Sequence, residues 1–149
     1  MERIDQQILA LLARDGRMSF TDLGRATGLS TSAAQQRVRR LEQRGLITGY
    51  HADLNPADLG RSLTAIISIQ GLNARQDDDI PGVLAGMAEI TSCFSVAGDA
   101  SVVCVAEVDS TNELDQLLTR IRHEANASTS TTMVLTTFFR NRPLIDQPA

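Results

Sequence analysis

The spacing of apolar residues changes near residue 60 and divides this chain into two parts. Before residue 50 apolar residues recur every three or four positions, as in amphipathic helices, whereas a strand-like alternation begins at Leu63. Between these regions lie Asn55-Pro56 and Gly60, which are typical of breaks in regular structure. The expected organisation is a helical domain over residues 1–50, a linker over 51–61 and a second domain over 62–149.

Three helices are expected in the first domain, with a short turn between the last two. The apolar spacing predicts a first helix that ends near Asp15-Gly16. Ser19 and Asp22 form a capping-box pattern at the start of the second helix, and Gly28 can take the left-handed conformation that ends it. Ser30 is a preferred N-cap for the third helix. The turn between these helices is therefore Gly28-Leu29-Ser30, about three residues, which is typical of a helix-turn-helix motif.

The third helix, expected over residues 31–44, has one apolar face and one polar, basic face. Ala34, Val38 and Leu41 share the apolar face by their spacing. In helix-turn-helix proteins this helix enters the major groove of DNA, where glutamine suits adenine and arginine suits guanine or phosphate. The alternative is a basic, solvated helix in a three-helix bundle that does not bind DNA. The candidate DNA contacts are Thr31, Ser32, Gln35, Gln36, Arg37, Arg39 and Arg40, of which Arg37 and Arg40 best suit phosphate.

The distribution of charge agrees with this division. The net charge is −4, yet residues 1–50 carry eight arginines against five acidic residues, and residues 51–149 carry six against thirteen. A basic half beside an acidic half indicates that the first domain faces double-stranded DNA.

The second domain has the predicted order strand, helix, strand, strand, helix, strand. This order matches a ferredoxin-like βαββαβ sandwich, an α+β fold in which both helices cover one face of the sheet. The other face needs a cover, and the sheet of a second subunit would supply it, so we expect a dimer or a larger assembly. The expected elements are a strand from Leu63 to near Gly71, a helix from Ile80-Pro81, hairpin strands over Ile90–Ala97 and Ser101–Val108, a helix from Thr111 to about His123, and a strand over Ser128–Phe139.

Several polar residues are explained by structure rather than by chemistry. The acids Asp77-Asp78-Asp79 suit a helix start better than a metal site, because calcium loops need further ligands and a fixed glycine. Cys93 and Cys104 are interpreted as reduced packing residues, nearly opposite each other in the hairpin. With His51 and His123 they lack the spacing of a zinc site. No metal site and no catalytic residues are therefore predicted, and the chain is not expected to be an enzyme.

A membrane location is not expected either. No apolar stretch approaches the length of a membrane helix, and Met1 to Leu12 carries charges where a signal peptide would be apolar. The sequence predicts a soluble, cytoplasmic protein.

Most of the chain resembles the Lrp/AsnC family of feast/famine regulators. IDQQILALLARDGRMSFTDLGRATGLS is similar to the family's first two helices, and STSAAQQRVRRLEQRGLITGYHADLNPADLG to its recognition helix, a following strand and the linker. The stretch RVRRLEQRGLITGY is the most specific part. The resemblance implies a winged-helix-like first domain and a second domain that dimerises by sheet packing, often builds octamers from four dimers, and binds an amino acid or related metabolite where subunits meet.

The resemblance also points to an effector site at the hairpin turn. Family members carry a glycine, two variable residues and an aspartate there; Gly98 matches, and Ser101 stands at the aspartate position. A serine hydroxyl is neutral and cannot pair with an ammonium group as a carboxylate does, but the neighbouring Asp99 can substitute. The turn is equally explained as a plain hairpin. The candidate effector residues are Gly98, Asp99 and Ser101, with Thr132 and Thr136 from the last strand.

These observations predict a sequence-specific DNA-binding transcriptional regulator that responds to an amino-acid-like effector and uses no cofactor. Paired recognition helices of a dimer would bind half-sites roughly 34 Å apart. Two alternatives stay open: a metabolite-binding module whose helical domain contacts protein, and a small enzyme on the second domain.

Overall fold

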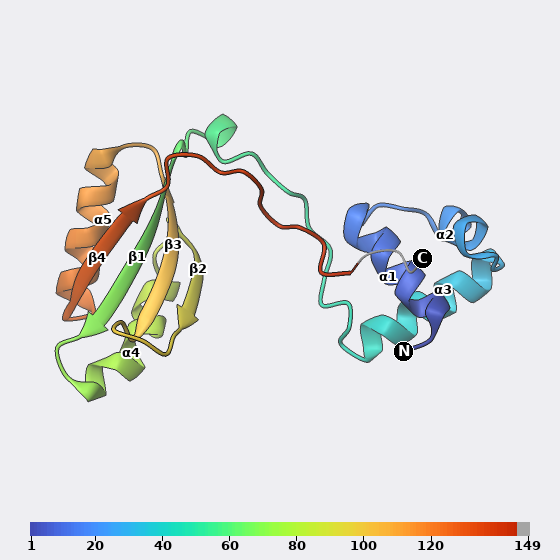
Figure 1. Cartoon of the computed structure of the whole chain (residues 1–149), viewed down its shortest axis with the longest axis horizontal. Coiled ribbons are helices and arrows are strands. Elements are labelled where there is room, and N and C mark those ends of the chain that lie inside the picture. Colours follow the sequence, from blue (N-terminus) through green and yellow to red (C-terminus); the bar gives the residue numbers. More distant parts are fainter. Residues whose placement is uncertain (146–149) are drawn as a thin grey trace. The chain divides into compact units, whose positions relative to one another are not determined.

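The computed structural model describes residues 1–145, except the side chains of residues 74–76 (Figure 1). The chain forms two compact units, one made of Met1–Asp53 together with the residues from Phe139 on, the other of Leu54–Phe138. The sequence assigned the end of the chain to the second domain. In the structure the Asn141 side-chain amide donates to Asp53 Oδ1 at 3.1 Å, a contact that joins the returning tail to the first unit.

The first unit has the three expected helices, α1 (Arg3–Arg14), α2 (Phe20–Thr27) and α3 (Thr31–Gln43). Both predicted caps are confirmed, because Ser19 Oγ accepts from the Asp22 amide at 3.1 Å and Ser30 Oγ accepts from the Ala33 amide at 3.2 Å. Gly28 ends α2 with a φ of +72°. The Asp22 carboxylate accepts from the Ser19 hydroxyl at 2.6 Å and does not reach back to the Ser19 amide.

The strand expected after α3 is absent from the described residues of the first unit. Gly45 turns the chain at a φ of +70°, and the amides of Leu46 and Ile47 both donate to the Leu41 carbonyl. The segment from Leu46 to Leu54 then continues as a loop. Its backbone has no strand in this part of the structure with which to form a ladder.

The second unit has the predicted βαββαβ order. Its four strands form one antiparallel sheet in the order β2-β3-β1-β4, and Figure 1 shows both helices on the same face. The elements are β1 (Leu63–Gly71), α4 (Ala74–Ala85), β2 (Ile90–Ser95), β3 (Val102–Val108), α5 (Thr111–Glu124) and β4 (Ala127–Met133), preceded by a short 3₁₀ helix, η1 (Ala57–Leu59).

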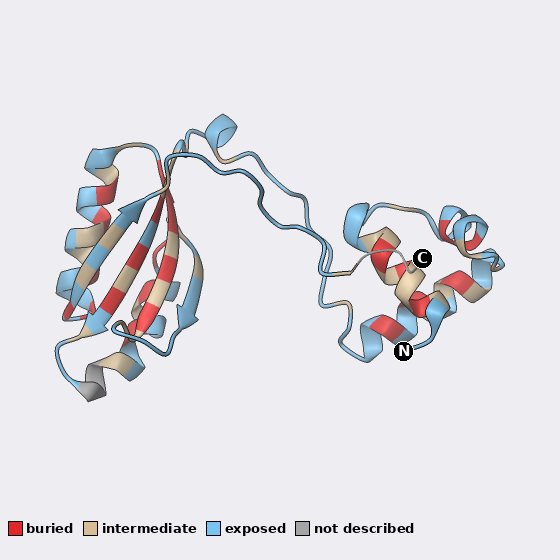
Figure 2. Cartoon of the chain, in the orientation of Figure 1, coloured by how far each residue is buried: buried red, intermediate tan, exposed pale blue. Residues whose placement is uncertain are grey.

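The core of the second unit lies between the sheet and its helices. Ala65, Ile67 and Ile69 alternate along β1 and are completely buried, as the red bands on this strand show (Figure 2). Ile80 and Leu84 of α4, with residues of α5, cover them. The intervening β1 residues face the opposite side, which no element of the second unit covers; we call it the open face.

Helix α4 and strand β4 differ most from their expected bounds, while β2 ends two residues earlier than expected and β3 begins one residue later. Helix α4 begins at Ala74, so the acids lie inside it and so does Pro81. The burial of Ile80 and Leu84 stabilises the helix in spite of the proline. Strand β4 ends at Met133 and is followed by one more bond, from the Val134 amide to the Thr64 carbonyl. Because β1 begins at Leu63, which the register places opposite residue 135, residues 136–139 have no partner on β1.

Cys93 and Cys104 are cross-strand partners, as expected. Cys104 is a buried packing residue, but Cys93 is exposed. Within residues 1–145 no helix is both long enough and apolar enough to cross a membrane.

The helix-turn-helix depends on Gly24, which is buried in α2. A Cβ atom at this position would lie 2.6 Å from the Leu29 carbonyl oxygen. Intrinsic propensity favours alanine over glycine in a helix by about 1 kcal/mol, but we expect Gly24→Ala to lower the free energy of unfolding by roughly 1–3 kcal/mol through this overlap. Urea denaturation followed by circular dichroism measures the change.

Gly82 in α4 is the matched control, because a Cβ there would meet nothing within 4 Å. Gly82→Ala should stabilise the protein by about 0.5–1 kcal/mol. Equal stabilisation by both substitutions would show that the close approach at Gly24 is unimportant.

Candidate nucleic-acid interface and effector site

Helix α3 presents a polar and basic face to solvent. Ala34, Val38 and Leu41 hold its other face in the core of the first unit. The predicted contact residues are therefore brought together on one helix surface. The exposed ones are Thr31, Ser32, Gln36, Arg39 and Arg40, whereas Gln35 and Arg37 are half-buried.

The N-terminal end of α3 suits a negatively charged group. Its first turn contains no acidic residue, and the free amides at a helix start favour anions. Hydroxyl groups gather beside it, since Thr31 Oγ1 donates to Thr21 Oγ1 at 3.4 Å and the oxygens of Ser30 and Ser32 lie 3.2 Å apart. Such an end can approach a phosphate while the exposed face meets base edges.

Arg37 is placed differently from the other arginines of α3. Its Nη1 donates to Asp5 Oδ1 and to Glu2 Oε2, each at 2.8 Å, and its side chain is only 24% exposed. The hydrogen bonds that the Arg37 guanidinium donates to Asp5 and Glu2 raise its pKa. Because Asp5 is 8% exposed, the pair fixes α3 against α1. The sequence pattern could not show this contact, since the partners are 32 and 35 residues away.

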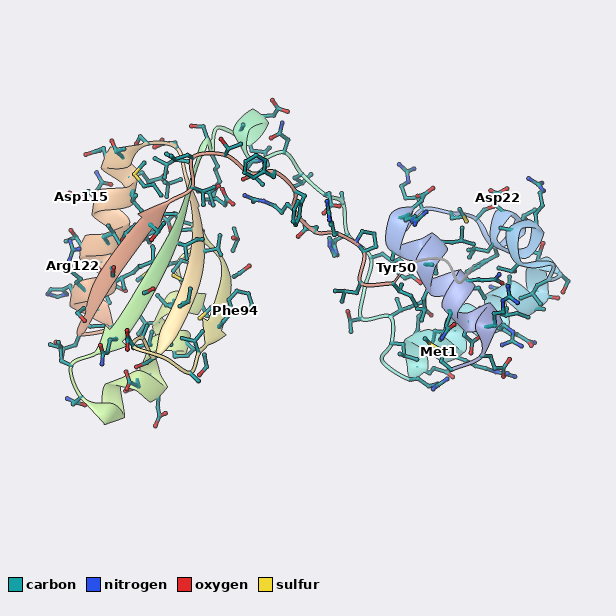
Figure 3. All side chains as sticks on the ribbon, in the orientation of Figure 1. Met1, Asp22, Tyr50, Phe94, Asp115 and Arg122 are labelled. Atoms are coloured by element: carbon teal, nitrogen blue, oxygen red, sulfur yellow. The ribbon has the colours of Figure 1, made fainter. Side chains whose placement is uncertain are left out.

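Tyr50, labelled in Figure 3, was not among the candidate residues. Its hydroxyl donates to Glu42 Oε1 at 2.9 Å, and its ring lies 3.6 Å from the position of a Cβ on Gly16. Burial and the Glu42 hydrogen bond raise the pKa of Tyr50 to about 12. The start of the linker is thus fastened to the last turn of α3. The one available signal was that Tyr50 is the sole tyrosine of the chain.

The second unit contains a hollow of about 170 Å³ where the hairpin turn meets the open face. Of the predicted effector residues it includes only Asp99. Gly98, Ser101, Thr132 and Thr136 do not line it, and Thr136 lies beyond the end of β4. The lining residues are Ser68, Ile69, Gln70, Asp99, Ala100, Ser128, Thr129 and Ser130.

Ser101 is used by the backbone of the turn. Its amide donates to the Ile69 carbonyl at 3.1 Å, and its carbonyl accepts from the Val96 amide at 3.2 Å. These bonds hold the hairpin turn, and Asp99 with it, beside the end of β1. Asp99 is exposed and supplies the one carboxylate among the lining residues.

The hydroxyl and amide groups of the hollow were missed from the sequence because they come from two strands. Ser68 pairs with Ser130, and Gln70 with Ser128, so all four share the open face. Only the register of β1 and β4 brings them together. The set combines an anionic carboxylate with neutral donors and acceptors, which suits a small ligand that carries both an ammonium and a carboxylate group.

Comparison with known families covers both units. Residues 1–42 match the AsnC-type helix-turn-helix domain, and residues 64–144 match the Lrp/AsnC ligand binding domain. The HTH-type transcriptional regulator LrpA of Mycobacterium tuberculosis (strain ATCC 25618 / H37Rv) is 44% identical over 142 residues, which are 95% of each chain. The leucine-responsive regulatory protein of Escherichia coli (strain K12) is 35% identical over 120 residues, 79% of this chain and 73% of that protein.

Solved structures give the same similarity. The crystal structure of the M. tuberculosis leucine response regulatory protein LrpA has a TM-score of 0.86 at 43% identity, and covers 97% of this chain and 99% of that one. A feast or famine regulatory protein from M. tuberculosis complexed with L-methionine has a TM-score of 0.93 at 44% identity, and covers 97% of this chain and 98% of that one.

Proposed function

Because this chain belongs to the Lrp/AsnC family of transcriptional regulators, we propose that α3 binds specific sites in double-stranded DNA and that an amino acid or related metabolite controls this binding. The observation that carries the proposal is the exposed face of α3, where Gln36, Arg39 and Arg40 lie together. The family consists of regulators and not of enzymes, so an activity on the second unit is set aside. Binding to chromosomal DNA would place the protein in the cytoplasm.

Each residue of this face has a distinct role in the proposal. Ser32 and Gln36 contact base edges, since a hydroxyl serves several bases and a glutamine pairs with adenine. Arg39 contacts guanine or a phosphate, and Arg40 a phosphate. Arg37 holds α3 in position through Asp5 and Glu2.

Fluorescence anisotropy across a salt series, with a duplex from the region upstream of the protein's own gene, tests these roles. Arg40→Gln should weaken binding to every sequence and reduce the slope of log affinity against log salt by about 1, because one phosphate contact and its released counterions are lost. Gln36→Ala should instead relax the preference at individual base pairs.

Arg37→Gln is the matched arginine control. It should leave the salt slope unchanged and lower the free energy of unfolding by roughly 1–3 kcal/mol, because Asp5 loses its partner. An unchanged slope in Arg40→Gln, or wild-type binding without salt dependence, would favour a protein-binding role for the first unit.

For the effector we propose the hollow beside Asp99. The Asp99 carboxylate receives the ammonium group of an amino acid, and the side chains of Gln70 and Ser130 donate to its carboxylate. The L-methionine complex of the M. tuberculosis relative supports this ligand class. The hollow opens at the surface of the second unit, so a neighbouring subunit can complete it. The ligand alters DNA affinity only if it binds one arrangement of the subunits more tightly than another.

Calorimetric titration with L-methionine and with pooled amino acids tests the role of Asp99. Asp99→Asn should reduce affinity by about ten-fold or more, because the ammonium group keeps an acceptor but loses its oppositely charged partner. Ser101→Ala should bind as the wild type does, since Ser101 acts through its backbone. The reverse pattern, with loss in Ser101→Ala alone, would move the ammonium site to Ser101.

We further propose that two copies pair through their open faces and that the dimers assemble to octamers. Ile66 is 38% exposed and Phe94, seen on β2 in Figure 3, is 55% exposed. Their strand partners on the same face are Val105 and Val103. An exposed apolar face of this kind is typical of a protein–protein interface. The open face of a second copy is equally apolar and of the same size, so it can cover this one.

Light scattering at micromolar concentration tests the assembly. The wild type should be a dimer or larger, and Ile66→Glu should yield monomers, because each interface would bury an unpaired charge. Gln116→Glu, which adds the same charge on the exposed side of α5, should leave the assembly unchanged. A monomeric wild type would contradict the proposal.

A further inference from the structure

The two cysteines of the chain lie opposite each other on neighbouring strands. Cys93 on β2 and Cys104 on β3 are direct partners in the antiparallel register. Directly opposed residues share a face of the sheet, and Cys104 is buried under the helices. Both side chains are therefore on the helix-covered face, opposite to Phe94.

The hydrogen-bond pattern places the cysteines at a site where side chains come closest. On the β2 side of β3 the Ser101 carbonyl accepts from the Val96 amide and the Glu107 amide donates to the Glu89 carbonyl, so both residues have a backbone group that faces β2. Hydrogen-bonded and non-hydrogen-bonded pairs alternate along an antiparallel ladder, so Cys93 and Cys104, three pairs beyond that of Ser101, form a non-hydrogen-bonded pair. The Cα atoms of such pairs are typically about 4.5 Å apart, which is within the range spanned by disulfides.

The two thiols differ in their access to solvent. Cys93 is exposed on the edge strand, whereas Cys104 is completely buried. A soluble oxidant therefore reaches Cys93 first, and the sulfur of Cys104 is the neighbouring nucleophile. Both are free thiols in this structure.

We propose that Cys93 and Cys104 form a thiol-oxidation site, which a two-electron oxidant such as hydrogen peroxide converts into an intrachain disulfide. The Cys93 thiolate attacks one peroxide oxygen, the O–O bond breaks, and the leaving hydroxide takes up a proton to become water. The sulfur of Cys104 then attacks the sulfur of the Cys93 sulfenic acid. The S–S bond forms, the S–O bond of the sulfenic acid breaks, and its hydroxyl group leaves with the Cys104 proton as a second water. Two thiols are oxidised and one peroxide is reduced to two waters.

The environment of the thiols makes this reaction dependent on pH. Burial raises the pKa of both cysteines, and that of Cys104 to about 11. The thiolate is the reactive form, so the rate of oxidation should rise with pH through the neutral range. The bond would close a loop that contains Asp99, and would fasten edge strand β2 while leaving the open face unchanged.

Peroxide treatment of the full-length protein tests the site, with thiol counting, intact-mass measurement and non-reducing electrophoresis. The wild type should lose both thiols, fall in mass by two hydrogen atoms, remain free of covalent dimers and recover both thiols with dithiothreitol. Retention of the Cys104 thiol, with oxygen added to Cys93 or with a disulfide between chains, would overturn the proposal.

Two single variants separate the steps. Cys93→Ser should keep its remaining thiol under the same treatment, because Cys104 is buried. Cys104→Ala should accumulate a Cys93 sulfenic acid that dimedone traps, since the second sulfur is absent. If Cys104→Ala does not fold, the Cys93→Ser result and the wild-type mass decide: rapid loss of the thiol in Cys93→Ser would contradict the assigned order of attack.

Discussion

The burial of Ile67 and Ile69 under α4 and α5 sets the register of β1, and most of the second unit depends on that register. β1 lies between β3 and β4 and pairs with both. A shift by one residue would expose this apolar set and bury Ser68 and Gln70 in its place. Packing on the helix-covered face therefore determines which residues lie on the open face. The polar residues of the proposed effector site lie on that open face and beside it.

The same register connects features that are distant in the sequence. Ser68 and Gln70 of β1 pair with Ser130 and Ser128 of β4. Cys104 of β3 pairs with Cys93 of β2. The hairpin between β2 and β3 supplies Asp99. One sheet thus supports a polar hollow, an apolar surface for a second copy and a pair of thiols, and these occupy different faces or ends of the sheet.

The arginines of α3 divide into two groups. Arg37 is committed to Asp5 and Glu2 and positions α3, whereas Arg39 and Arg40 are exposed. A substitution at Arg37 therefore acts on DNA binding through the placement of the helix. Tyr50 binds Glu42 in the last turn of α3, so the middle and the C-terminal end of the helix are each held by contacts from outside it.

The sequence by itself determined the helices of the first unit, the order of elements in the second and the exposed residues of α3. These follow from local rules: Ser19 and Ser30 cap the helices next to them, Gly28 permits the turn, and the apolar spacing marks the buried faces. The tertiary structure alone decided that Arg37 is paired within the unit, that β4 ends at Met133, and that Asp99 lines the hollow while Ser101 and Thr136 do not. Those outcomes depend on contacts between residues far apart along the chain, such as Asp5 with Arg37 or Ser68 with Ser130, and the spacing within one segment carries no information about its partners in another.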